Sequence, residues 1–188
     1  MGCDTNGYVG FGLYALVSYI QKPLSGFLDE LRLQLAPNCQ PHAHVTILPP
    51  RPLKASENQA QAELRELAAQ FHAFEVKLGK VELFDSTDVI YIEVLGGASE
   101  LRSMHRRLNT GSVEYPEPFD FHPHITLAQN ISHESVQETL RRARELWSAW
   151  PGSRSFAVEE LSFVKHQERE GWVDLLHLPL AHEPSLVS

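Results

Sequence analysis

Apolar residues recur along this chain with two different periods, and the changes of period divide it into short elements. Stretches with aromatic and β-branched bias predict strands, and Pro49-Pro50 is expected to end the second of them. The turn Glu168–Gly171 is expected to join the last two as a hairpin. The predicted strands are Phe11–Tyr19, Ala43–Leu48, Phe74–Leu83, Val89–Val94, His124–Ala128, Phe156–Lys165 and Trp172–Leu178.

Between these strands, four stretches carry apolar residues at helical spacing. Pro23 suits the first turn of the first helix, and Ser56 with Gln59 three residues later forms a capping-box pattern at the second. Ser99 and Ser132 are predicted to cap the third and fourth helices. The predicted apolar faces are Leu24, Phe27, Leu28, Leu31 and Leu35; Ala60, Leu64, Leu67, Ala68 and Phe71; Leu101, Met104, His105 and Leu108; and Val136, Leu140, Ala143 and Trp147.

The order strand-helix-strand-helix-strand therefore occurs twice and is followed by one extra strand. At 188 residues the chain is expected to form a single bilobal domain, residues 1–188, with an N-terminal half at about 8–85 and a C-terminal half at about 86–180. Two such halves could build one doubly wound sheet or two related lobes that face each other.

Composition and charge exclude several classes of protein. The 43% hydrophobic and 21% charged residues are typical of a globular chain, and no apolar run is long enough to span a bilayer. A net charge of −8 disfavours binding to long nucleic acids, because their phosphates would be repelled. Cys3 and Cys39 are too few for a disulfide framework. We expect a cytoplasmic monomer with no membrane partner.

A short motif is repeated in the two halves. Residues 42–47 read His-Ala-His-Val-Thr-Ile, and residues 122–127 read His-Pro-His-Ile-Thr-Leu. Both contain His-apolar-Thr-apolar, and the two copies are 80 positions apart on equivalent predicted strands. Two matched copies in matched context are a specific signal, whereas one copy alone would read as an ordinary strand with a polar face.

The alternation of a strand places each histidine and threonine of the motif on the same face. His44 and Thr46 would therefore meet His124 and Thr126 across a groove if the halves pack about a pseudo-twofold axis. Two histidines can act as general base and general acid on either side of a phosphorus, and hydroxyls can bind its non-bridging oxygens. An ordinary histidine pKa of about 6.5 keeps both protonation states available near neutral pH.

With these motifs the chain resembles the 2H phosphoesterase superfamily, and in particular its 2'-5' RNA ligase-like and cyclic nucleotide phosphodiesterase branches. The resemblance extends from Phe11 to Leu178. It implies an α+β fold, bilobal and duplicated about a pseudo-twofold axis, with antiparallel-rich sheets lining a central cleft and helices outside. It also implies cleavage of cyclic phosphodiesters, commonly 2',3'-cyclic ends of RNA or small nucleotides, and in some members joining or opening of 2'-5' RNA linkages.

The same resemblance implies catalytic roles for His44 and His124 and substrate-binding roles for Thr46 and Thr126, without metal or cofactor. The analogy favours His124 as the base and His44 as the acid. Two alternatives stay open: a non-catalytic nucleotide or RNA-end binding module, and a His-rich metalloprotein that uses the His-x-His pairs, whose outer members are His42 and His122.

Other residues are candidates for binding a base or a phosphate. Phe119 and Phe121 lie in a proline-bounded loop before the second motif, so they are the aromatic residues best placed to border a groove. Substrate specificity is expected to lie in loops such as Gly111–Phe121. The remaining candidates are the aromatic residues Tyr14, Tyr91, Phe163 and Trp172 and the cationic residues Arg51, Lys54 and Lys165.

Overall fold

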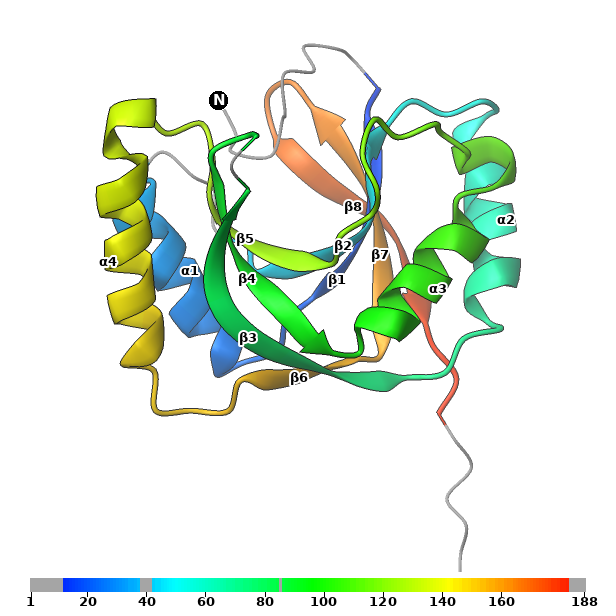
Figure 1. Cartoon of the computed structure of the whole chain (residues 1–188). Helices are drawn as coiled ribbons and strands as arrows, with labels where there is room; N and C mark the ends of the chain where they lie inside the picture. Colours follow the sequence, from blue (N-terminus) through cyan, green and yellow to red (C-terminus); the bar gives the residue numbers. More distant parts are fainter. Residues whose placement is uncertain (1–11, 38–41, 85, 183–188) are drawn as a thin grey trace, which may run out of the picture.

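The computed structural model describes residues 12–37, 42–84 and 86–182, and within them the chain forms two four-stranded sheets with four α-helices outside (Figure 1). Cys3 and Cys39 lie outside the described residues. The strands are β1 (Tyr14–Tyr19), β2 (His44–Arg51), β3 (Phe74–Phe84), β4 (Val89–Gly96), β5 (His124–Ala128), β6 (Ser155–Val158), β7 (Glu160–Gln167) and β8 (Gly171–Pro179). The helices are α1 (Leu24–Leu35), α2 (Glu57–Ala68), α3 (Ala98–Leu108) and α4 (Val136–Ser148).

Both sheets are antiparallel throughout. Their strand orders are β2-β1-β7-β8 and β5-β4-β3-β6, so each motif strand, β2 or β5, is the edge strand of its sheet beside the first strand of its half. Helices α1 and α4 lie on one side of the sheets and α2 and α3 on the other (Figure 1). The α+β fold with antiparallel sheets and outer helices is confirmed, and a doubly wound parallel sheet is excluded for the described residues.

The two sheets do not follow the expected boundary near residue 85. β3, expected in the N-terminal half, belongs to the sheet of the second motif, whereas β7 and β8 complete the sheet of the first. The predicted single strand Phe156–Lys165 is wrong, because the chain leaves one sheet and enters the other at Glu159. Both parts carry the same apolar pattern, so periodicity alone could not reveal a break of one residue.

Three predicted element ends also need correction. β2 continues through Pro49-Pro50 to Arg51, which an edge strand tolerates because one side needs no ladder hydrogen bonds. Gly97, with φ 80°, precedes α3, and Ser99 lies inside the helix. Ser132 precedes a short 3-10 turn before α4 and makes no side-chain cap. The Ser56 cap is confirmed, since its hydroxyl accepts from the backbone N–H of Gln59 at 3.3 Å.

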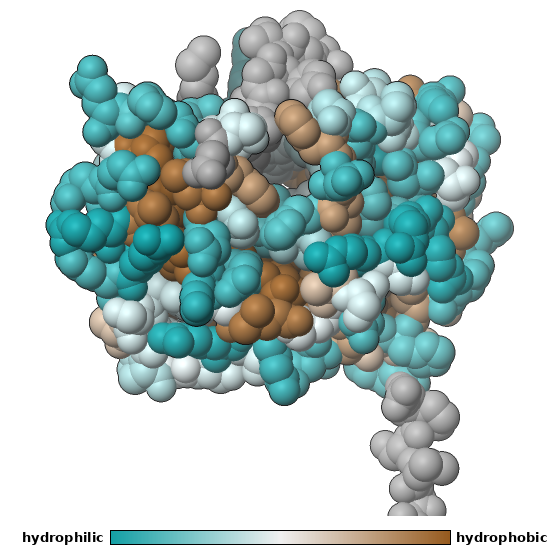
Figure 2. Space-filling view, viewed as in Figure 1, coloured by the Kyte–Doolittle hydropathy of each residue, from teal (hydrophilic) through white to brown (hydrophobic). Residues whose placement is uncertain are grey.

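One continuous hydrophobic core joins the two sheets and the four helices. α1 packs against α4, and Phe27 of α1 stacks on Trp150, just after the end of α4, at a ring-centroid distance of 4.5 Å. Helices of the two halves thus cover each other's apolar faces. The face in Figure 2 is mainly hydrophilic, with hydrophobic residues in separate patches. None of the helices in the described residues is long and apolar enough to cross a membrane.

Candidate active site

The two motif strands position their histidines and threonines in the same way. On β2 and β5 the burial alternates: the four motif residues His44, Thr46, His124 and Thr126 are partly exposed, and the apolar residues between them are fully buried. The buried side chains pack into the core and so fix the register that turns the polar ones the other way. β2 and β5 are also in contact with each other, which brings the two polar rows together.

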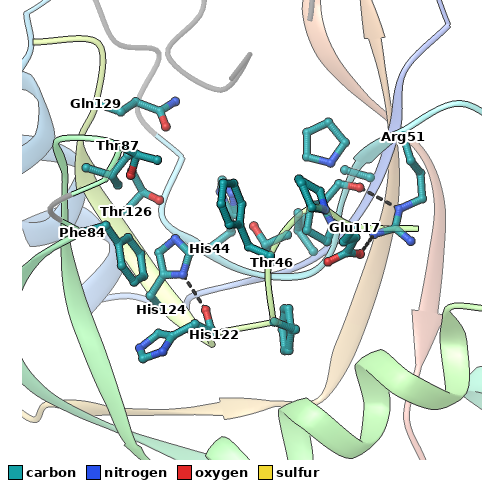
Figure 3. Close-up of a pocket in the computed structure, with 18 of the residues that line it drawn as sticks. His44, Thr46, Arg51, Phe84, Thr87, Glu117, His122, His124, Thr126 and Gln129 are labelled. Atoms are coloured by element: carbon teal, nitrogen blue, oxygen red, sulfur yellow. Dashed lines mark hydrogen bonds and ion pairs between the residues drawn. The ribbon is translucent and has the colours of Figure 1, made fainter. Parts of the chain in front are cut away.

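All four motif residues line one open cavity of about 420 Å³ (Figure 3). The two histidines and two threonines therefore meet in one cavity, as the repeated motif suggested. The volume of the cavity suits a small ligand. Other residues that line it were not singled out from the sequence, chiefly Phe84, Thr87, Glu117 and Gln129.

Each motif histidine is held by the backbone carbonyl of the histidine two residues before it. Nδ1 of His44 lies 2.6 Å from the carbonyl oxygen of His42, and Nδ1 of His124 lies 2.7 Å from that of His122. A carbonyl oxygen can only accept, so Nδ1 carries the proton in both rings. Nε2 is therefore the nitrogen that carries a lone pair on the neutral ring and a proton on the charged one.

The surroundings of His124 and His122 shift their pKa values away from that of a histidine in water. The pKa of His124 is lowered to about 4, chiefly by burial. The hydrogen bond to the His122 carbonyl raises this pKa, and the nearby His122 and His44 rings lower it. His124 is thus neutral at neutral pH. The pKa of His122 is also lowered, first by burial and then by Arg102, with Glu93 opposing.

Aromatic rings surround both pairs of histidines. Tyr19 stacks against His42 at a centroid distance of 4.3 Å and donates its hydroxyl to Asp174 Oδ1 at 2.6 Å. On the other side, Phe84 meets the ring of His124 edge-on at 5.1 Å. The outer histidines also line the cavity, and each supplies the carbonyl that orients its neighbour.

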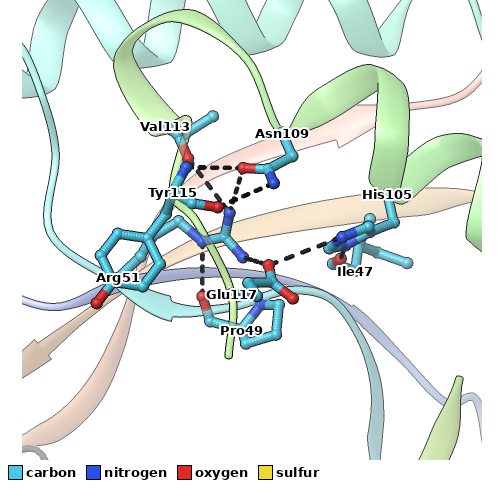
Figure 4. A network of polar contacts seen from close by, with 8 residues as sticks. All are labelled: Ile47, Pro49, Arg51, His105, Asn109, Val113, Tyr115 and Glu117. Atoms are coloured by element: carbon cyan, nitrogen blue, oxygen red, sulfur yellow. Dashed lines mark hydrogen bonds and ion pairs between the residues drawn. The ribbon is translucent and has the colours of Figure 1, made fainter. Parts of the chain in front are cut away.

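A buried polar network fixes the loop after α3 to the end of β2 (Figure 4). The guanidinium of Arg51 donates to the carbonyl of Pro49 at 2.8 Å, to Asn109 Oδ1 at 2.7 Å and to a carboxylate oxygen of Glu117. The side chain is 1% exposed, and burial lowers its pKa although Glu117 raises it. Arg51 therefore belongs to the wall and is not available to a bound phosphate.

The other cationic candidates lie away from the cavity. Lys54 pairs with Glu114, and Lys165 pairs with Glu57 at 2.9 Å; neither is among the lining residues. Among the aromatic candidates, Tyr14 and Phe163 stack on each other in the core. The aromatic candidates that do line the cavity are Phe119, Phe121 and Trp172. Tyr91 does not line it but packs against the ring of His124 at 5.4 Å between ring centroids.

The loop Gly111–Phe121 contributes one wall of the cavity through its second half, residues 115–121. Phe121 stacks on His105 at 4.0 Å between ring centroids, and His105 donates from Nδ1 to the carbonyl of Ile47 at 2.8 Å. Phe119 is 68% exposed at the rim. In the described ranges, no group of three or more His, Cys, Asp or Glu side chains is arranged to hold a metal ion.

The chain is similar in sequence to known proteins of one family. A family model described as the 2'-5' RNA ligase superfamily matches residues 20–170. A protein of Halalkalibacterium halodurans named as a phosphoesterase is 24% identical over 139 residues, which is 70% of this chain and 78% of the relative. The RNA 2',3'-cyclic phosphodiesterase of Aeropyrum pernix is 32% identical over 100 residues, or 49% of this chain and 57% of the relative.

Solved structures share the fold. The crystal structure of Escherichia coli LigT in its apo form has a TM-score of 0.61 and 14% identity, over 90% of this chain and 98% of LigT. LigT complexed with 3'-AMP has a TM-score of 0.58 and 18% identity, over 90% of this chain and 99% of that one. At these identities the likeness concerns the fold alone.

Proposed function

The chain belongs to the 2'-5' RNA ligase superfamily, a family of 2H phosphoesterases, and from that premise we propose that it is a metal-independent cyclic phosphodiesterase. Its substrate class is a nucleotide or RNA end that carries a 2',3'-cyclic phosphate. The observation that carries the proposal is the pair of Nδ1-anchored histidines, each with a threonine beside it, in one cavity. The relative named as an RNA 2',3'-cyclic phosphodiesterase supports this substrate class, and the LigT complex with 3'-AMP supports a nucleotide as the ligand.

In the proposed mechanism His124 is the general base and His44 the general acid. Burial keeps His124 neutral, so its Nε2 can take a proton from water as the water oxygen attacks phosphorus. His44, protonated at Nε2, gives that proton to the ribose oxygen as the ring P–O bond breaks. Cyclic diester and water thus become one phosphomonoester, and the two histidines exchange protonation states.

Thr46 and Thr126 donate their hydroxyls to the non-bridging oxygens, where negative charge accumulates in the transition state. The alternation that puts each hydroxyl on the same face as its motif histidine supports this role. Because each step is reversible, the same site could join a cyclic end to an incoming hydroxyl as a 2'-5' linkage.

The test is a panel of 2',3'-cyclic nucleotides and short RNAs with cyclic ends, assayed with a chelator present. We expect turnover to a single phosphomonoester that the chelator leaves unchanged. Binding without turnover by the wild-type protein would favour a non-catalytic binding module. Bound zinc in stoichiometric amount, with activity lost on its removal, would instead support the metalloprotein alternative and contradict the two-histidine mechanism.

A further inference from the structure

The charges around the cavity are unusual for a phosphate site. All 16 Lys and Arg residues of the chain fall within the described residues, and Arg51 is the one that lines the cavity. The guanidinium of Arg51 makes a fourth hydrogen bond, to the carbonyl of Val113 at 3.3 Å, besides those to Pro49, Asn109 and Glu117. All three guanidinium nitrogens are engaged with protein, so this cation does not reach a ligand.

Negative charge, by contrast, borders the cavity. Asp120 lines it, and the charge of the lining residue Glu117 is balanced by Arg51. Asp174 accepts a hydrogen bond from the hydroxyl of the lining residue Tyr19 at 2.6 Å. Arg102 acts electrostatically on His122, but it is not a lining residue, and Glu93 acts on the same ring in the opposite direction. A protonated histidine is therefore the positive charge that a ligand in this cavity would meet.

Substrate and product of the proposed reaction differ in charge. A cyclic phosphodiester has one ionisable oxygen and carries one negative charge. The monoester that forms from it has a second ionisation near pH 6 and carries close to two negative charges at neutral pH. Acid–base catalysis moves a proton from one histidine to the other, so the site holds a single histidinium before and after the reaction.

We propose that the cavity selects its ligand by charge: it binds monoanionic phosphodiesters and disfavours the dianionic monoester, so that hydrolysis itself weakens the hold on the product. This inference rests on the proposed function, since it assumes that phosphate binds between the motif histidines. It deepens that function by restricting the substrate to phosphodiesters and by giving the cavity a way to release what it makes.

The test compares two ligands of one shape at pH 7.5 by calorimetry: a nucleoside 3'-phosphate and the corresponding 3'-methylphosphonate, in which a methyl group replaces one ionisable oxygen. We expect the monoanionic methylphosphonate to bind more tightly by on the order of tenfold, as expected for one unit charge at several ångströms in a partly aqueous site. Equal or tighter binding of the phosphate would overturn the proposal. The comparison is strict, since the methyl group also removes a hydrogen-bond acceptor, and this loss alone would weaken binding of the methylphosphonate.

Two variants show whether charge is the cause. Gln129 is an uncharged lining residue on the His124 side of the cavity (Figure 3). Gln129→Arg should strengthen binding of the phosphate and reduce the preference for the methylphosphonate. The matched variant Gln129→Met adds no charge and should leave that preference unchanged. Asp120→Asn should also strengthen phosphate binding. A preference that neither Gln129→Arg nor Asp120→Asn changes would contradict the proposal.

Turnover of the cyclic phosphate panel in the same preparation separates the two conclusions. Hydrolysis of cyclic diesters together with phosphate binding at least as tight as methylphosphonate binding would support the proposed function and contradict the charge selection. If no cyclic diester is turned over, the proposed function itself is wrong.

Discussion

At the scale of single residues, the carbonyl groups of His42 and His122 have a different importance from their side chains. Each carbonyl fixes the tautomer and orientation of a motif histidine. A substitution at the outer positions keeps that carbonyl, because the backbone is unchanged. The inner and outer histidines should consequently respond differently to mutation, although all four line the cavity.

We predict that His44→Ala and His124→Ala each lower kcat/KM for a cyclic nucleotide by on the order of 10²–10⁴, the usual contribution of one general acid or base. His42→Ala and His122→Ala should lower it by less than about tenfold, since only ring packing is lost. Steady-state kinetics on the four variants checks this. Equal losses at inner and outer positions would show that the assigned roles are wrong.

The pH dependence follows from the burial of His124. If it is the base, kcat/KM rises with pH as the free enzyme loses the proton of His124, so the acidic limb should lie near its pKa of about 4 and not near 6.5. The alkaline limb should follow deprotonation of the acid, His44. A pH–rate profile of the wild type measures both limbs, which belong to the coupled pair.

His124→Ala should remove the acidic limb from whatever activity is left. An acidic limb that stays near pH 6.5 in the wild type would contradict the assignment of His124 as the base. From the sequence alone, the unperturbed value of about 6.5 is the natural expectation for both histidines. Burial of one of them depends on Phe84, Tyr91 and His122 around it, and that arrangement follows from the tertiary structure.

At the scale of elements, the Arg51 network explains how an irregular loop becomes a wall of the cavity. The loop has little regular structure between α3 and β5 except a short 3-10 turn at Gly111–Val113. Glu117 binds Arg51 at the end of β2, and Asn109 both accepts from Arg51 and bonds the backbone of Tyr115. The loop is therefore positioned by the strand that carries His44.

We predict that Glu117→Gln destabilises the fold by about 3–5 kcal/mol, because it leaves the Arg51 charge buried without its partner. It should also raise KM for the cyclic substrate more than it lowers kcat, since the loop wall loosens. Urea unfolding and steady-state kinetics measure the two effects. Lys54→Met is the control: it breaks an exposed pair with Glu114 and should cost about 1 kcal/mol or less. Similar losses of unfolding free energy for both variants would show that the buried pair contributes no more to stability than the exposed one.

Local sequence signals predicted most elements because the apolar faces of helices and strands follow simple periods. α2 begins where Ser56 and Gln59 indicated, and the β7–β8 hairpin turns before Gly171, whose φ of 73° suits glycine. The errors in these predictions lie at the ends of helices and strands. A left-handed Gly97, in place of Ser99, precedes the first residue of α3, because a Cβ there would lie 2.8 Å from the carbonyl oxygen of Glu75 on β3.

At the scale of the whole molecule, the repeated motif predicted that two histidines and two threonines would meet, and they line one cavity. It could not predict the Arg51–Glu117 pair, whose members are distant in sequence and have ordinary surface composition around them. Nor could it predict which strands share a sheet. The third strand of each sheet comes from the other half of the chain, and no local pattern encodes that pairing.

This exchange of strands predicts cooperative unfolding. β3 and the β7–β8 hairpin each complete the sheet of the other half, and one core joins both sheets. Urea unfolding monitored by tryptophan fluorescence, from Trp147 and Trp150 on one side and Trp172 on the other, should coincide with loss of far-ultraviolet dichroism in one transition. A chain of residues 86–182 alone should not fold. Two separate transitions, or a folded fragment, would contradict this.

The pairing of β1 with β7 also has a consequence for synthesis. The chain emerges from the ribosome N-terminus first, so β1 and β2 are made long before β7 and β8, the strands that complete their sheet. During that interval one edge of β1 has unpaired backbone N–H and C=O groups, a template on which other nascent chains can add. Production of this protein therefore depends on how that edge is kept from aggregating until the last hairpin has been translated.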